Sequence, residues 1–560
     1  MCTKQKCVFI LINFLFYFFP SISFSQECET SSDTHNNTNT NKSYKIKLDS
    51  LFDDVSGFST TELIQSVVLG ADIWNWQGNT GSFRYTGTTS ITIPLLADMD
   101  TQAKCNTLGI NYSIVYLTTE EDSNSAHNDA ICGGNQFLIE LYLYDENLSI
   151  RNFGNGATSN VRDISGTVAH EFGHSLGLGH CNDDVDESNV YCIMRTSTTP
   201  NANWRALYEW EYQCTVDNSS FRDNYAYRRE HTSSGFGSPT QISNTNNIVK
   251  ATSGITYDPT AKYTSIYHET STYAWDEYGG SNTDITNPST YNGSGLVNTI
   301  WRESTGTDRM IYSYWDDDGS DYTLDSVHIV RQIRSTNEFS SQTNENLSRC
   351  TSMTGWMTCS STTDVDSYGP ISFGFLDDID RTVSVWMNHD RTDYSNFDDF
   401  NEIYISVGHV NDSTLSIPHQ TDIRTSVPPS VSCLEDFSGS YDCIMTYVNI
   451  SDMTNTIKSR RFYVSTGTNN YNITLDSTEY TVNSNAKTAS PMALWYISTN
   501  SKFYLAFRSS ETNQNINIYE SNTSGTSWTL ITSNLDYSIT GPSAVGVFRG
   551  SNNQLVYTQE

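Results

Sequence analysis

Three histidines and one glutamate are grouped in the sequence HEFGHSLGLGH, which runs from residue 170 to residue 180. His170 and His174 are four residues apart, so a helix places both imidazoles on one face, within reach of a single metal ion. Gly177 lets the chain leave that helix through a left-handed turn, which can bring His180 to the same ion. We therefore predict that the three histidines hold zinc and that Glu171 accepts a proton from water at the open fourth position.

Cys181 offers an alternative interpretation of the same stretch, because it directly follows the third histidine. A structural zinc site fills its fourth position with cysteine or histidine and excludes water. Cys192 can instead take Cys181 as a disulfide partner. We therefore favour the open, catalytic type of site.

The full pattern H-E-x-x-H-x-x-G-x-x-H resembles that of the metzincin zinc proteases, and HEFGHSLGLGH is most similar to the matrixin branch. The resemblance implies a zinc endopeptidase domain over residues 44–215, with a twisted sheet and two helices above the cleft. It implies a methionine turn at 192–194, with Met194 beneath the metal but not bound to it. It also implies that substrate lies along an edge strand. We assign that edge to residues 137–144 (FLIELYLY), with an ordinary core strand as the alternative.

The elements that must position the site can be predicted from the same region. Ser59 and Glu62 fit a capping box that begins a helix, and Phe58 and Leu63 fit its hydrophobic staple. Ser159 or Asn160 can cap the helix of the histidines, with Asp163 in its first turn. Strands are predicted at 44–48, 83–86, 111–117 and 137–144, and a third helix at 203–212. The fold class of this part is therefore α/β.

Beyond about residue 216 the helical patterns stop, and short strands alternate with turn residues. Two phrases recur there. The first occurs at 262–269, 295–304, 382–390, 442–449 and 502–510, and the second at 309–324, 401–410, 460–475 and 515–530. The second phrase repeats roughly every 50 residues, about the length of a four-stranded propeller blade. We expect an all-β domain over residues 216–560, a β-propeller, and keep an array of β-sandwiches as the alternative.

The last repeat contains Ser521-x-Thr523-x-Gly525-x-x-Trp528, which resembles the Asp-box hairpin of sialidase-like propellers with threonine in place of aspartate. Such a hairpin has a polar side chain that caps backbone amides, a glycine with positive φ and an aromatic ring packed between strands. A weaker copy spans residues 317–322. The run DDDG at 316–319 lacks the spacing of an EF-hand, so we interpret it as a turn. Whether a structural Ca²⁺ ion is bound is left open.

The first 25 residues have the order of a secretory signal, with Lys4 and Lys6 before an apolar stretch and small residues at 23–25. That stretch is shorter than the roughly 20 residues that a membrane-spanning helix needs. A polar, low-complexity tail follows at residues 26–43. We expect a secreted, extracellular protein without a membrane span.

Ten cysteines follow the signal, and an even number in an exported chain predicts disulfides. Pairs that are close in sequence suggest themselves, although spacing alone does not fix the connectivity. These pairs are Cys350 with Cys359, Cys433 with Cys443, Cys105 with Cys132, and Cys181 with Cys192.

The 31 basic and 64 acidic residues give a net charge of −33, which argues against nucleic acid as a partner. We expect a protein or peptide substrate, and a carbohydrate or protein ligand for the propeller. Two alternatives remain: a glycan-active propeller with an accessory N-terminal domain, and an adhesin with a relic zinc site. The first needs clustered arginines, which are scattered here, and an intact Glu171 argues against the second.

Overall fold

The computed structural model describes residues 41–77, 82–94, 96, 99–154, 161–180 and 193–194, and between 225 and 559 the strands with part of their connecting segments. Within these residues, helices occur only before residue 176, and strands form the regular structure from residue 225 onward. The coarse expectation of an α/β part followed by an all-β part is therefore confirmed. The signal peptide, nearly all of the polar tail, the predicted helix at 203–212 and the boundary at 215 lie outside the described residues. No helix in the described part is long and apolar enough to span a bilayer.

The N-terminal part is built on a five-stranded sheet in the order β2-β1-β3-β5-β4. The strands are β1 (Asn41–Leu48), β2 (Ser82–Thr88), β3 (Ser113–Asp122), β4 (Ala126–Ile131) and β5 (Gln136–Asp145). Four strands are parallel, and β4 alone is antiparallel to its neighbour. All four strands predicted in this region are confirmed. The sequence did not predict β4, because its buried alternate positions include two alanines and an asparagine.

The assignment of residues 137–144 to the edge of the sheet is wrong. They form β5, which lies between β3 and β4 and pairs with both. Its continuous apolar run is the pattern of a strand that is covered on both faces. The antiparallel edge strand is β4, and it contacts the helix of the histidines.

The helices are α2 (Phe52–Ser56), α3 (Thr60–Gln77), α4 (Thr101–Leu108) and α5 (Ile164–Ser175), with a 3-10 turn η1 (Cys132–Gly134) and a two-residue pair of short strands, β6 (Phe153–Gly154) and β7 (Arg162–Asp163). The predicted capping box at the start of α3 is present: the Ser59 amide donates to the Glu62 carboxylate at 2.7 Å, and the Glu62 amide donates to Ser59 Oγ. At α5 the cap is Asp163, which accepts from the Ser165 amide. Asp163 is therefore the N-cap of α5, where we expected a first-turn residue.

Helices cover both faces of the sheet. Alternate residues of the strands point to α3 and α5 on one face and to α4 on the other, in two separate apolar clusters. Phe172 anchors α5 on the sheet, because its ring lies 4.5 Å from that of Phe83 and 5.2 Å from that of Tyr44. The aromatic residue inside HEFGH therefore faces the core, which leaves the histidines on another side of the helix.

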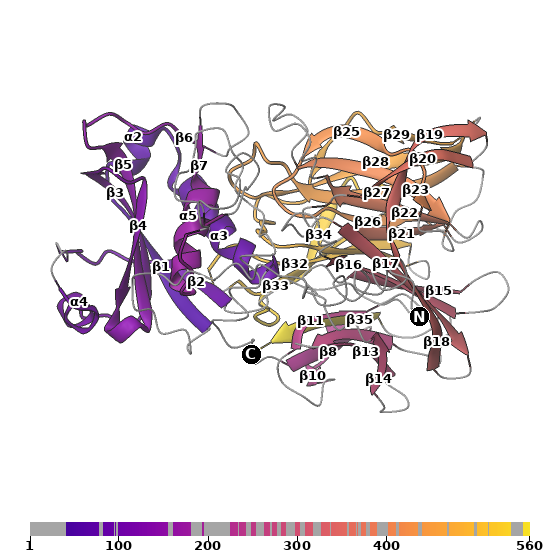
Figure 1. The fold of residues 1–560 in the computed structure, drawn as a ribbon, viewed down its shortest axis with the longest axis horizontal. Helices are drawn as coiled ribbons and strands as arrows, with labels where there is room; N and C mark the ends of the chain where they lie inside the picture. Colours follow the sequence, from indigo (N-terminus) through magenta and orange to yellow (C-terminus); the bar gives the residue numbers. More distant parts are fainter. Residues whose placement is uncertain are drawn as a thin grey trace, which may run out of the picture.

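The C-terminal part consists of successive sheets whose strands pair antiparallel, except for the parallel pair of β19 and β24 (Figure 1). Their strands, in chain order, are β8 (Tyr225–Thr232), β9 (Gly235–Phe236), β10 (Thr240–Gln241), β11 (Ile248–Ser253), β12 (Tyr263–His268), β13 (Ser271–Asp276), β14 (Asn282–Thr286), β15 (Val297–Arg302), β16 (Asp308–Asp316), β17 (Ser326–Ser335), β18 (Glu338–Asn346), β19 (Ser348–Gly355), β20 (Thr358–Asp364), β21 (Ser372–Leu376), β22 (Arg381–Met387), β23 (Glu402–His409), β24 (Thr414–Leu415), β25 (His419–Arg424), β26 (Ser430–Cys433), β27 (Ser440–Val448), β28 (Ile457–Thr466), β29 (Tyr471–Leu475), β30 (Tyr480–Thr481), β31 (Ala493–Ile497), β32 (Lys502–Arg508), β33 (Ile516–Asn522), β34 (Trp528–Thr532) and β35 (Asn553–Gln559).

The sequence repeat corresponds to neighbouring strands of these sheets. Where both phrases of a repeat were recognised, they pair antiparallel, as β15 with β16, β22 with β23, β27 with β28 and β32 with β33. The last strand, β35, pairs with the first, β8, so that the two ends of the series belong to one sheet. Strands at the ends of neighbouring sheets contact one another, as β21 contacts β26 and β26 contacts β31.

The hairpin between β33 and β34 has the features expected of its motif. Gly525 has a φ of +63°, and Trp528 is buried. The indole of Trp528 donates to Ser459 Oγ on β28 of the adjacent sheet at 3.0 Å. The capping side chain is Asn522, which accepts from the Ser524 amide, and not the predicted Thr523. The weaker copy at 317–322 lies outside the described residues.

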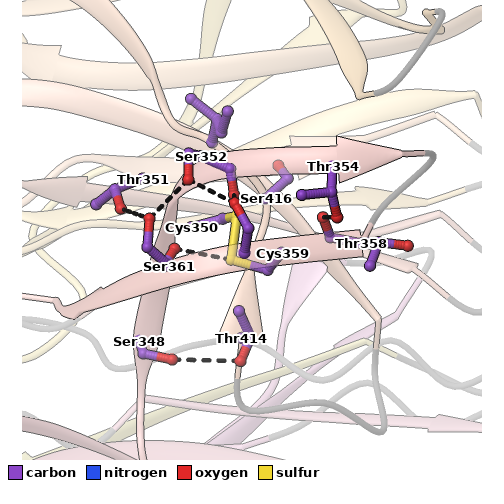
Figure 2. Close-up of a disulfide and its surroundings, with 12 residues drawn as sticks. Ser348, Cys350, Thr351, Ser352, Thr354, Thr358, Cys359, Ser361, Thr414 and Ser416 are labelled. Atoms are coloured by element: carbon purple, nitrogen blue, oxygen red, sulfur yellow. Dashed lines mark hydrogen bonds between the residues drawn. A yellow bond between two sulfur atoms is a disulfide. The ribbon is translucent and has the colours of Figure 1, made fainter.

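Three of the four suggested disulfides are present: Cys105–Cys132, Cys350–Cys359 and Cys433–Cys443. Cys181 and Cys192 lie outside the described residues. Figure 2 shows the disulfide that joins β19 to β20, with a row of hydroxyl groups beside it. Thr351 and Ser352 both bond to the hydroxyl of Ser361 on the facing strand. The disulfide and the hydroxyl pairs thus join β19 to β20, two strands that have few apolar residues.

Candidate metal site

The three histidines predicted from the sequence converge in the structure. The ring centroids of His170 and His174 are 4.8 Å apart, and those of His180 lie 5.2 Å and 4.9 Å from them. One ligand nitrogen from each ring lies within 4.8 Å of the others, and this is the one such cluster found among the described residues. Two nitrogens that each contact one zinc ion at about 2.0–2.1 Å are at most about 4.2 Å apart. The three rings therefore surround the position of an ion and would move closer together when they bind it.

Local backbone geometry explains how His180 reaches the other two rings. Helix α5 ends at Ser175, and Gly177 adopts a φ of +87°, the left-handed conformation predicted for it. The Leu178 amide donates to the carbonyl of Gly173 at 3.2 Å, and the Gly177 amide donates to that of His174 at 2.8 Å. This pair of bonds is a Schellman motif, which reverses the chain direction at the end of the helix.

Backbone carbonyls fix the orientation of two imidazoles. Nδ1 of His170 is 2.7 Å from the carbonyl of Ile193, and Nδ1 of His174 is 2.7 Å from the carbonyl of Leu178. A carbonyl only accepts, so each Nδ1 carries the proton and each Nε2 presents a lone pair. This second layer of hydrogen bonds is the arrangement that orients histidine ligands of zinc. The donor set, three imidazole nitrogens of which two have a fixed tautomer, therefore fits zinc.

Burial also keeps these rings neutral. Desolvation lowers the pKa of His170 to about 3, with smaller contributions from the neighbouring histidines. Desolvation likewise lowers the pKa of His174 to about 4. Neutral imidazole is the form that binds a metal ion, so at neutral pH neither ring has to lose a proton before binding.

The same shifts predict how the metal-free protein responds to acid. The unfolded chain binds protons on these rings below pH ~6.5, the ordinary histidine pKa, whereas the folded chain does not until pH ~4. The contribution of these two rings to folding stability is therefore fully present above pH ~6.5 and is lost as the pH falls toward 4. Thermal unfolding in chelator between pH 7.5 and 5 measures the loss. The loss should shrink in His174→Gln but not in His127→Gln, whose side chain is 51% exposed.

Glu171 lies on α5 directly after the first histidine and is buried, with 6% of its surface exposed. Its backbone carbonyl accepts a hydrogen bond from Asn128 Nδ2, which also donates to Ser175 Oγ at 2.8 Å. Asn128 belongs to the edge strand β4. The strand at the edge of the sheet is therefore bonded directly to the turn of helix that carries Glu171.

Met194 lies beneath the histidine helix, where the resemblance placed it. Its side chain is fully buried, and a Cβ atom built on Gly173 would lie 2.2 Å from Met194 Sδ and 2.8 Å from Trp74 Cζ2. The preceding residue, Ile193, supplies the carbonyl that orients His170. Gly173 thus allows the methionine to approach α5 closely.

Replacing Gly173 by alanine is expected to lower the free energy of unfolding by about 1–3 kcal/mol. Overpacking a filled core costs this much, and it outweighs the gain of up to about 1 kcal/mol from a better helix former. Urea unfolding measures the change. Because Met194 makes the closest contact, Met194→Ala combined with Gly173→Ala should cost less than the sum of the single changes. A strictly additive pair would contradict this contact.

The sequence did not identify Lys42 and Asn128 as contributors to the site. Lys42 on β1 is buried, and its Nζ donates to the carbonyl of Ser175 at 2.6 Å. Burial lowers the pKa of Lys42 to about 8. The ammonium group meets the negative end of the α5 dipole, which favours its charged form there. The sequence analysis placed Lys42 in the polar tail at 26–43, whereas β1 begins at Asn41 and includes this lysine.

Comparisons with known proteins place this site in no known family. Neither a family model nor a curated protein sequence matches the chain. Among solved structures, a nidogen/laminin complex matches with a TM-score of 0.35 and 8% identity over 57% of this chain and 97% of that chain. A fucose-specific lectin from Aleuria aurantia matches at 0.31 and 8%, over 52% and 83%, and a levansucrase variant from B. megaterium at 0.30 and 10%, over 55% and 88%. Likeness at this level carries no functional argument, so the site is interpreted from its own geometry.

Proposed function

We propose that this protein is a secreted zinc-dependent endopeptidase of the metzincin type, with a C-terminal β-propeller. The observation that carries the proposal is the convergence of three imidazoles beside a buried glutamate. His170 and His174, oriented through Nδ1, would hold the ion together with His180. The disulfides of the structure fit an extracellular location, because such bonds persist in oxidising compartments.

A zinc ion held by three neutral imidazoles would lower the pKa of a coordinated water to about 7 and would polarise a peptide carbonyl. Glu171 would accept the proton of the water that attacks the carbonyl carbon. The same carboxyl then delivers the proton to the nitrogen of the leaving amine. Because all three ligands are neutral, the ion would keep its full charge and would supply electrostatic stabilisation to the reaction. In this proposal His170 and His174 therefore hold the zinc ion, and Glu171 transfers the proton from the water to the leaving amine.

The edge strand β4 is our proposed docking strand for an extended peptide. It has one neighbour in the sheet, β5, so its other edge is available for main-chain pairing among the described strands. Asn128 links this strand to the carbonyl of Glu171. A peptide added to β4 would therefore be held in register with the general base. This assignment replaces the edge strand expected at 137–144.

The propeller is supported by the repeat of antiparallel sheets and by the pairing of β35 with β8. Such closure joins the first and last blades of a propeller. A carbohydrate or protein ligand for this part remains our proposal. The glycan-active alternative requires a group of arginines in a central pocket, and one of the candidates, Arg508, is instead fully buried against Asp72.

The test combines metal analysis with a peptide-library digest of the purified protein, with and without chelator. We expect about one zinc per chain and hydrolysis that chelator abolishes and added zinc restores. Zinc without hydrolysis would favour a relic site, and hydrolysis that persists in chelator would refute the proposal.

A further inference from the structure

Helix α3 is buried on all sides, although only part of its surface faces the sheet. Nearly every residue from Leu63 to Trp76 is buried, including the polar residues Gln65, Ser66, Asp72 and Asn75. A helix that packs on a sheet normally turns such residues to solvent. Here Gln65 donates to the carbonyl of Ser510 and Asp72 accepts from Arg508, both in the C-terminal part. In Figure 1, α3 lies beside β32 and β33 of that part. The two parts also share one apolar cluster.

The centre of this contact is an ion pair without exposure to water. Arg508 Nη1 at the end of β32 donates to Asp72 Oδ1 at 2.6 Å, and the two side chains are 0% and 1% exposed. Ser490 donates to the other carboxylate oxygen at 3.2 Å, and Asn75 donates to Oδ1 at 2.7 Å. A buried charge pair is tolerated only when further hydrogen bonds satisfy both partners, and both partners have such bonds here.

Two loops of the C-terminal part extend this contact. In the loop after β32, Gln514 accepts from Arg508 at 2.8 Å and from the backbone amide of Tyr85 at 2.9 Å, which covers the open edge of β2. In the loop after β27, Asn455 Nδ2 donates to the carbonyl of Gln65 at 2.9 Å. Gln514 and Asn455 both adopt positive φ, at 50° and 55°. Strained backbone of this kind persists where the surroundings hold it in place.

From α3 the contact continues to the helix of the histidines. The indole nitrogen of Trp74 donates to the carbonyl of Ala169, the residue before His170, at 2.8 Å. One turn away, a Cβ atom on Gly70 would lie 2.5 Å from the carbonyl of Ser165. The two helices therefore touch backbone to backbone, and α3 cannot shift without displacing α5.

We propose that Asp72 and Arg508 are positioning residues for the histidine site. The C-terminal part would then hold α3 in place, and α3 would hold the histidine helix. This role would be separate from the binding of any ligand by the C-terminal part. This inference rests on the proposed function for its metal readout. Loss of either charge leaves the other buried and unpaired, which displaces α3 and, through Trp74 and Gly70, the histidine helix.

The test uses the full chain and compares Asp72→Asn and Arg508→Met with Val385→Ala. Val385 is fully buried on β22 in a separate apolar cluster, so its truncation destabilises the C-terminal part without touching α3. Zinc affinity is measured by chelator competition, the visible spectrum of the Co²⁺-loaded site reports ligand geometry, and hydrogen exchange reports the amides of α5. We expect zinc to bind at least 10-fold more weakly, the Co²⁺ spectrum to change and α5 to exchange at least 10-fold faster in the two ion-pair variants only. Arg508→Lys keeps the charge and should restore much of the loss.

The inference would be overturned if the amides of α5 exchange no faster in the ion-pair variants than in Val385→Ala. It would also be overturned if the ion-pair variants keep both the zinc affinity and the Co²⁺ spectrum of the unaltered protein. If the unaltered protein binds neither zinc nor Co²⁺, the proposed function fails, and hydrogen exchange of α5 still decides whether the ion pair positions this helix. If the single variants do not fold, Ser490→Ala, which removes one hydrogen bond to Asp72 and leaves both charges in place, carries the same comparison.

Discussion

The Glu171→Gln variant is expected to retain zinc and to lose peptide hydrolysis by about 10²- to 10⁴-fold, the usual contribution of a general acid–base group. Glutamine has nearly the same shape as glutamate but cannot accept the proton of the attacking water. The histidines lie on the same helix and keep their own bonds to the carbonyls of Ile193 and Leu178. Zinc content and initial rates on a cleaved library peptide measure the two effects.

Two control variants define what this result means. Glu140→Gln makes the same chemical change on β5, at a half-buried glutamate that bonds to Tyr142, and should leave the rate unchanged. His174→Gln should instead lose zinc and activity together. Hydrolysis at the normal rate in Glu171→Gln would refute its role as the base, even if zinc is bound.

Replacing Arg508 alone by methionine is expected to lower the free energy of unfolding by about 3–5 kcal/mol, because the carboxylate of Asp72 is then buried without its partner. Both side chains are closed off from solvent, so water cannot solvate the carboxylate that remains. Burial already raises the pKa of Asp72, and Arg508 opposes that rise through its charge and its hydrogen bond. Urea unfolding, with the slope checked for two-state behaviour, measures the change.

The double variant Asp72→Asn with Arg508→Met removes both charges and should recover most of this loss. The amide introduced by Asp72→Asn can still bond to Ser490 and Asn75, which hold the carboxylate in the natural chain. Lys487→Met is the matched control, because Lys487 pairs with a half-exposed Glu511, and it should cost at most about 1 kcal/mol. If the losses in unfolding free energy from the two single changes instead add in the double variant, the two side chains do not stabilise each other.

The metal ligands were predictable because they are close in sequence. Helical spacing brings His170 and His174 together, and a turn closed by local hydrogen bonds returns His180 to them. These contacts depend on residues at most ten positions apart, so the pattern of residue types is sufficient. The start of α3 and the disulfides Cys350–Cys359 and Cys433–Cys443, which span 9 and 10 positions, were predictable for the same reason.

The wrong predictions concern features that depend on which segments of the chain become neighbours in the fold. An apolar run such as β5 fits an edge or an interior strand equally well, and only the pairing with β4 decides that it is interior. Strand β4 itself carries few apolar residues, because Asn128 turns inward to bond with α5. The cap of α5 was misplaced because several polar residues precede the helix. In the structure Asp163 has extended backbone, and its side chain accepts from the Ser165 amide.

The sequence by itself determined the make-up of the candidate metal site: the three histidines, their spacing and the neighbouring carboxylate. It also determined the repeated strand pattern. Tertiary structure alone decided which strand lies at the open edge beside the histidines, and that Asp72 meets Arg508 across 436 positions of chain. The physical reason is that helical spacing and turn geometry are properties of short segments. Burial and charge pairing across the chain depend on how the whole molecule packs.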